Sequence, residues 1–145
     1  MKRVQITSEA RKWQGCKWQH QASLKGVACD CVGLIRGVYR VLTGKELKTT
    51  VDYPATWHLF KGEPWLLNEC RSLAGPEIDV SKVRPGDILT FSFRDKFVDH
   101  HIGIMLEGGM FIHSYMDVGF VVVTRLDDTW KGRLRHAFCF PEVED

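Results

Sequence analysis

Long apolar runs, blocks of like charge and internal repeats are all missing from this sequence of 145 residues. Because it has no run of about 18 apolar residues, no segment is expected to cross a membrane as a helix. The 20 basic and 18 acidic residues are interspersed and leave a net charge of only +2. Nucleic-acid-binding proteins use a basic stripe and none is present, so no nucleic acid partner is expected.

A signal peptide and a disulfide framework are also missing. Residues 1–9 begin with positive charge, but polar residues interrupt before an apolar segment forms, so we expect a protein that is cytoplasmic at synthesis. Five cysteines are an odd number, and without secretory context they indicate reduced thiols. Three of them, Cys16, Cys70 and Cys139, are interpreted as small buried residues.

The residues that are present predict one globular domain, residues 1–145, of the α+β class. A hydrophobic content of 44% is enough for one core at this length. Helical spacing dominates the first half and extended segments the second, so N-terminal helices are expected to pack on a C-terminal antiparallel sheet. Helices are expected at 9–14, at 31–43 and within 51–75, and strands of a meander at 88–93, 101–106, 110–115, 120–124 and 134–140.

The segment 29–41 is interpreted as a nucleophile at the start of a helix. Asp30 suits an N-cap, apolar residues then recur at helical spacing, and Gly44 gives a stop. Cys31 falls in the first turn at the edge of the apolar face, where unpaired N–H groups and the helix dipole favour a thiolate. Cys31 rather than Cys29 is therefore the candidate nucleophile.

Two histidines lie on neighbouring expected strands, and the turn between the strands decides whether they meet. With a two-glycine turn, His101 and His113 point to opposite faces of the sheet. With a three-residue turn at 107–109, Gly103 lies opposite His113 and the histidines become diagonal neighbours on one face. His101 would then be a base for a thiol, and His113 would hold its other ring nitrogen. Strand alternation sends the adjacent His100 to the other face.

Five short segments keep a recognisable order and spacing over most of the chain. They are Trp18-Gln19-His20-Gln21, Asp30-Cys31-Val32-Gly33-Leu34-Ile35, Arg84-Pro85-Gly86-Asp87-Ile88-Leu89, His101-Ile102-Gly103-Ile104 and Phe111-Ile112-His113-Ser114. Together they resemble the NlpC-type cell-wall cysteine peptidases, a papain-like family, and in particular its phage-tail branch. The resemblance implies a papain-like fold with the nucleophile at a helix N-terminus.

The resemblance also implies a catalytic triad and a substrate. Cys31 would be the nucleophile, His101 the general base and acid, and His113 the residue that orients His101. The implied reaction is hydrolysis of peptide stems of bacterial peptidoglycan, typically between D-γ-glutamyl and a diamino acid, and no cofactor is expected. Members of the phage-tail branch are delivered by the virion, which implies phage tail proteins as partners and action in the cell wall.

Many family members place a tyrosine before the nucleophile, and Trp18 and His20 occupy that neighbourhood here. His20 can donate a hydrogen bond, so the resemblance places it near the oxyanion or the substrate carbonyl. Trp18 and Asp30 are further candidates for the same region.

Three other functions are considered. The same fold could form a structural tail-tip or assembly component without using its chemistry. A thioester resolved by an amine or alcohol would make the protein a thiol acyltransferase. Zinc binding by Cys29, Cys31, His101 and His113 is disfavoured, because a one-residue gap between the cysteines departs from the usual spacing of zinc ligands.

Overall fold

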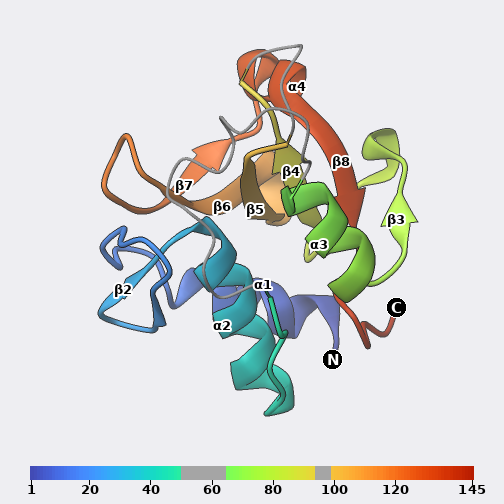
Figure 1. Cartoon of the computed structure of the whole chain (residues 1–145). Coiled ribbons are helices and arrows are strands. Elements are labelled where there is room, and N and C mark those ends of the chain that lie inside the picture. The colour runs from blue at the N-terminus through green and yellow to red at the C-terminus, as the bar shows by residue number, and fades with distance from the viewer. Residues whose placement is uncertain (50–64, 94–98) are drawn as a thin grey trace.

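Helices come first and strands mostly follow in the described part of the chain, residues 1–49, 65–93 and 99–145 of this computed structural model (Figure 1). The α-helices there are α1 (Arg3–Arg11), α2 (Cys31–Thr43), α3 (Trp65–Leu73) and α4 (Asp128–Arg133). The strands there are β1 (Ser23–Leu24), β2 (Ala28–Cys29), β3 (Glu77–Ile78), β4 (Ile88–Phe91), β5 (His101–Met105), β6 (Met110–Tyr115), β7 (Phe120–Arg125) and β8 (Leu134–Phe138). The class is α+β, as predicted.

Within the described residues, six strands form one antiparallel sheet in the order β3-β8-β4-β5-β6-β7. Strands β4 to β7 follow one another as the expected meander. The meander was expected to continue into the last strand, β8, and this is wrong. Thr90 of β4 lies opposite His136 of β8, so β8 pairs with β4, on the edge of β4 that faces away from β5. The short helix α4, which we did not predict, separates β7 from β8. Local patterns indicate that a segment is a strand, but they do not encode which sheet edge it joins.

The sheet separates two apolar clusters, because alternate residues of a strand face opposite sides. On one side, α1 and α2 pack against β5 (Figure 1), and Leu34 of α2 lies in the same buried cluster as Ile104. On the other side, Phe91 and Phe111 pack with Trp130 of α4. The expected packing of N-terminal helices on a C-terminal sheet is therefore observed.

Helix α1 begins at Arg3, and the expectation of a helix over 9–14 is wrong at both ends. Thr7 lies inside the helix, and its hydroxyl donates to the Glu107 carboxylate at 2.8 Å. The residues Ile6 and Ala10 are buried and lie about one helical turn apart on the same face. Because this face packs in the core, the helix begins before residue 9.

The segment Arg84-Pro85-Gly86-Asp87 forms the turn that leads into β4. Asp87 is fully buried, and its carboxylate accepts hydrogen bonds from the Arg84 backbone N–H at 2.7 Å and the Arg3 guanidinium at 2.6 Å. The first of these bonds closes the turn. The second ties the start of α1 to the sheet.

Helix α3 (Trp65–Leu73) lies within the segment 51–75 that was expected to hold short helices. Trp57, His58, Phe60 and Pro64, which also belong to that segment, lie outside the described residues. No helix in the described part of the chain is long and apolar enough to span a membrane.

Candidate active site

Cys31 is the first residue of α2, as the sequence predicts. The Asp30 carboxylate caps the helix by accepting a hydrogen bond from the Gly33 backbone N–H at 2.7 Å. The helix ends at Gly44, whose φ of 71° is left-handed and therefore suits glycine. The local sequence thus determines both ends of the helix that presents the thiol.

The Cys31 sulfur lies within hydrogen-bonding reach of the backbone N–H groups of Val32 and Ile102. These groups lower the pKa of the thiol, but its burial raises the pKa by more, and the nearby Asp30 carboxylate raises it further. The backbone N–H groups therefore act in the direction that the helix start predicts, and burial opposes them. Part of the surface of Cys31 nevertheless remains exposed to solvent.

The turn between β5 and β6 has the three-residue form on which the histidine pairing depends. Ile104 lies opposite Ile112 in the ladder, and the Leu106 backbone N–H donates to Met110 at 2.8 Å, which closes the turn at Glu107–Gly109. Gly108 and Gly109 have φ values of 75° and 73°, which glycine adopts at little cost. The register that separates the two histidines is thus excluded.

The two histidines meet on one face of the sheet. His101 Nε2 lies 2.7 Å from His113 Nδ1, and the exposed fractions of the two residues are only 6% and 0%. Gly103 leaves the space for this contact, because a Cβ there would lie 2.9 Å from the Ile112 carbonyl oxygen and 3.2 Å from the Cβ of His113. The remaining His113 nitrogen, Nε2, lies 2.8 Å from Thr124 Oγ1.

This chain of contacts determines which nitrogen of His101 is available. If Nε2–H of His101 donates to His113, then Nε2–H of His113 donates to Thr124, and Nδ1 of His101 is left as an acceptor. Burial lowers the pKa of His101 well below its ordinary value and that of His113 to about 3, so both rings are neutral at pH 7. A neutral imidazole with a free lone pair is a proton acceptor.

Cys31 lies beside the strand that carries His101, but its sulfur is not bonded to that ring. Ile102, whose N–H the sulfur approaches, is the residue after His101. Among the residues that the structure describes, no hydrogen bond joins the Cys31 sulfur to His101 or His113. Catalytic contacts are often loose in free enzymes and tighten when substrate binds. Proton transfer from Cys31 to His101 would require such an approach.

Three further residues that the sequence suggested lie around the start of α2. Asp30 is buried, and its second oxygen accepts from the Gln21 backbone N–H at 2.7 Å, so its carboxylate positions the loop and the helix rather than facing substrate. Trp18 lies on the same loop, and its backbone N–H donates to Gly119 at 2.8 Å. His20 lies on the loop between Trp18 and Gln21. Contact of Trp18 or His20 with substrate stays a prediction.

The expectation that strand alternation sends His100 to the other face of the sheet does not apply, because His100 precedes the strand. Strand β5 begins at His101, so strand alternation does not orient the preceding residue. The His100 ring packs edge-on against Phe93 at 4.6 Å, and Phe93 also lies 5.9 Å from the His101 ring. Both rings therefore contact the same aromatic side chain.

The sequence reasoning missed the groups that surround the histidine pair. Thr124 could have been found, because a four-residue turn between β6 and β7 places it diagonally from His113 on the same face. The Tyr115 ring stacks on His113 at 5.1 Å, and the Trp130 ring meets His113 edge-on at 5.1 Å. No local pattern connects Trp130 to a strand that precedes it in the sequence.

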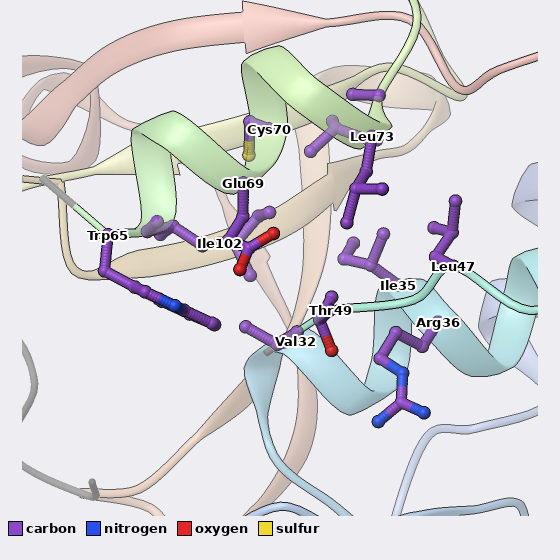
Figure 2. Close-up of a pocket in the computed structure, with 13 residues that line it drawn as sticks. Val32, Ile35, Arg36, Leu47, Thr49, Trp65, Glu69, Cys70, Leu73 and Ile102 are labelled. Atoms are coloured by element: carbon purple, nitrogen blue, oxygen red, sulfur yellow. The ribbon is translucent and has the colours of Figure 1, made fainter. Parts of the chain in front are cut away.

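An apolar pocket of about 40 Å³ lies on the other side of the sheet, between α2 and α3 (Figure 2). Val32 and Ile102, the neighbours of Cys31 and His101 in the sequence, are on its wall, with Trp65 and Leu73 from α3. Its surface is almost wholly apolar, so it offers few hydrogen-bonding groups to a peptide backbone. None of the three candidate catalytic residues lines it.

No metal centre is assembled by the candidate ligands. Within residues 1–49, 65–93 and 99–145, no group of three or more His, Cys, Asp or Glu side chains is placed to hold a metal ion. Cys29 is fully buried in the cluster between the helices and the sheet, whereas the histidine rings lie on the opposite face.

Known proteins share the sequence pattern and the fold. The model of the NlpC/P60 family matches residues 11–138. The gamma-DL-glutamyl hydrolase of Bacillus subtilis (strain 168) is 23% identical over 131 residues, which cover 90% of this chain but only 28% of that protein.

Solved structures confirm the papain-like architecture of this family. The NlpC/p60 domain of the peptidoglycan hydrolase SagA superimposes with a TM-score of 0.66 at 22% identity, covering 95% of this chain and 98% of that one. RipD from Mycobacterium tuberculosis, described as a non-catalytic NlpC/p60 domain protein adapted to peptidoglycan binding, gives 0.59 at 12% identity and covers 96% of both chains. The family match extends over most of the chain, and the chain therefore belongs to the NlpC/P60 family.

Proposed function

We propose that this protein is a cysteine peptidase that cleaves peptide stems of bacterial peptidoglycan, at the bond between D-γ-glutamyl and a diamino acid. The observation that carries the proposal is the contact of His101 with His113 beside a cysteine at a helix start. The name of the Bacillus relative, a gamma-DL-glutamyl hydrolase, supports the choice of bond. We propose that residues 1–145 act as one peptidase domain.

The proposed reaction begins with a neutral thiol and a neutral imidazole. Nδ1 of His101 accepts the Cys31 thiol proton as the sulfur attacks the amide carbonyl, and the Cys31 backbone N–H stabilises the oxyanion. The C–N bond then breaks as His101 returns the proton to the leaving amine. Water, deprotonated by His101, hydrolyses the thioester to give a carboxylate and restore the thiol. His113 holds His101 throughout, and Thr124 holds His113.

The experiment for this function is a digest of purified peptidoglycan and of the tripeptide L-Ala-γ-D-Glu-meso-diaminopimelate. Mass spectrometry should detect L-Ala-D-Glu and free diaminopimelate, with a new carboxylate on the glutamate side chain. Intact tripeptide and unchanged muropeptides after prolonged incubation would contradict the proposal.

A non-catalytic role is the second candidate, and a specific observation favours it. The pKa of the Cys31 thiol is raised, and in the described residues its sulfur makes no hydrogen bond to a histidine. A structural tail-tip component would bind peptidoglycan sacculi in a pull-down without releasing fragments. Product release in the digest would contradict this alternative.

Transfer of the acyl group to an amine or alcohol would use the same thioester. Mass spectrometry in the presence of added glycine amide distinguishes the outcomes, because transfer gives a conjugate of L-Ala-D-Glu and hydrolysis gives the free acid. The phage-tail setting and virion delivery, with tail proteins as partners, stay proposals that rest on the resemblance carried by the order and spacing of the five sequence segments. Proteomics of purified tail particles would test them.

A further inference from the structure

A guanidinium group lies beside the histidine pair, held by two aromatic rings. Arg133 is the last residue of α4, and its Cζ lies 4.8 Å from the centroid of the Phe93 ring and 4.7 Å from that of Trp130. The Arg133 carbonyl accepts a hydrogen bond from the Ser92 backbone N–H at 2.8 Å, so its backbone is also fixed. Stacking on two rings limits the orientations of the planar group.

The same rings contact the proposed base. The centroids of the Phe93 and Trp130 rings lie 5.9 Å and 6.2 Å from that of the His101 ring. These two rings therefore contact both Arg133 and His101. The positive charge of Arg133 also reaches Tyr115, where it lowers the pKa of the hydroxyl against the raising effects of burial and Asp117. Tyr115 in turn lies 5.5 Å from His101.

Arg133 has no carboxylate partner in the described part of the chain. Other arginines pair with acids: Arg3 with Asp87 at 2.6 Å and Arg11 with Glu107 at 3.2 Å. Asp117, the acid that lies beside Tyr115, accepts the hydrogen bond of the Tyr115 hydroxyl. A partly buried guanidinium whose donors have no carboxylate partner among residues 1–49, 65–93 and 99–145 is suited to bind a planar carboxylate from outside the chain.

The position of Arg133 relative to Cys31 selects which carboxylate this is. Cys31 packs with the cluster between the helices and the sheet, whereas Trp130 belongs to the cluster on the opposite face. The His101 ring lies 6.2 Å from the Trp130 ring that Arg133 stacks on, so His101 and Arg133 share one side of the sheet, while Cys31 packs on the helix side. Because His101 protonates the leaving amine in the proposed reaction, the leaving residue must lie on the His101 side of the scissile bond.

From this placement we propose that Arg133 is a specificity-determining residue that binds a free carboxylate on the leaving residue of the substrate. The inference rests on the proposed function for the direction of the substrate. It predicts a preference for stem peptides whose leaving residue carries a free carboxylate over those in which this group is amidated.

The test measures binding to the Cys31→Ala protein, so that no turnover is needed. L-Ala-γ-D-Glu-L-Lys with a free C-terminal carboxylate and the same peptide as a C-terminal amide are titrated by calorimetry. The free acid should bind at least about 10-fold tighter, since a charge-assisted pair is lost in the amide. Adding Arg133→Met should weaken binding of the free acid to the level of the amide and leave the amide unchanged.

Lys131→Met is the matched control, because it removes an exposed positive charge from the same helix. It should keep the preference, and Arg133→Lys should keep part of it. Equal or undetectable binding of the two peptides to the Cys31→Ala protein would overturn the inference, whether or not the Arg133 variants fold. Equal weakening of both peptides by Arg133→Met would overturn it as well. A retained preference with no hydrolysis by the wild-type protein would contradict the proposed function alone.

Discussion

At the scale of single residues, the environment of the two reacting groups keeps both of them neutral. Burial raises the pKa of the Cys31 thiol and lowers that of His101, so neither change favours the charged pair of thiolate and imidazolium. The proposed attack therefore requires proton transfer to occur as the sulfur–carbon bond forms. This makes the orientation of His101, and hence the His113 contact, decisive for the rate.

Replacement of His113 should change both the rate and its pH dependence. His113→Ala removes the group that holds Nε2 of His101, and kcat/KM for the stem peptide should fall on the order of 10-fold or more. Burial is the main cause of the lowered His101 pKa, and loss of the His113 ring exposes the neighbouring His101 ring, so the variant should have a higher His101 pKa. The acid limb of kcat/KM, which reports protonation of the base, should then move to higher pH.

The pH profile of His113→Ala is compared with that of His113→Gln. A glutamine can still accept a hydrogen bond from His101, so His113→Gln should retain more activity than His113→Ala. An unshifted acid limb together with an unchanged rate in His113→Ala would show that His113 does not position the base.

Single residues were also where the sequence was most informative. The positions of Cys31 and His101 could be predicted because a helix start and a strand start have local signals, whereas the pairing with His113 depended on a turn length that the sequence left open. Trp130 and Arg133 could not be predicted to approach these residues. Their position depends on α4 and on the return of β8 to β4, which are matters of tertiary packing.

At the scale of secondary structure elements, the β5–β6 pair is the element that assembles the site. Its register follows from the turn at Glu107–Gly109, and its close approach depends on Gly103. The sequence permitted two registers and offered no means of choosing between them. The choice follows from packing, because the observed register places Ile112 of β6 beside Ile104 on the helix side of the sheet, where the other register would place His113.

Gly103→Ala should separate these strands where the histidines meet. The added Cβ would lie 2.9 Å from the Ile112 carbonyl oxygen, which is closer than carbon atoms approach backbone oxygens without a shift. The free energy of unfolding should fall by about 1–3 kcal/mol, and kcat should fall further than the loss of folded protein explains. Urea unfolding and stem-peptide kinetics measure the two effects.

Gly132→Ala is the control for this prediction. Gly132 lies in α4 with nothing within 4 Å of the position of an added Cβ, so the variant should match the wild-type protein in activity and be at least as stable, because alanine favours the helix. If Gly103→Ala is as active and as stable as Gly132→Ala, the tight approach of β5 and β6 is not required.

At the scale of the whole molecule, two buried neutral histidines make folding dependent on pH. The pKa of His113 is about 3 in the folded state and 6.5 ordinarily, and that of His101 is also lowered. The unfolded chain therefore binds more protons than the folded one between these values. The stabilisation is fully present above pH 6.5 and is lost as the pH falls toward 3.

The measurement is the free energy of unfolding in urea at intervals from pH 7 to pH 4.5, above the range in which most carboxylates titrate. Each histidine that stays neutral in the fold should contribute up to about 1.4 kcal/mol per pH unit in the window below 6.5. His113→Gln should have a shallower slope. An equal slope in the variant would show that His113 does not carry this dependence.

The whole-molecule architecture was partly predictable. Helices followed by strands indicated α+β, and the observed fold confirms it, but β8 crosses back to β4 and α1 begins at Arg3. Both differences arise because burial against distant segments outweighs local signals. That the chain acts as one peptidase domain, and where in a cell or virion it acts, stay predictions.

A matched pair of cysteine variants tests whether Cys31 is the nucleophile. Cys31→Ala and Cys29→Ala differ from each other only in which of two cysteines, one residue apart, is removed. Release of diaminopimelate from L-Ala-γ-D-Glu-meso-diaminopimelate is followed by mass spectrometry, with circular dichroism to verify folding. We expect no product from Cys31→Ala and near wild-type release from Cys29→Ala. Release by folded Cys31→Ala at the wild-type rate would contradict the claim.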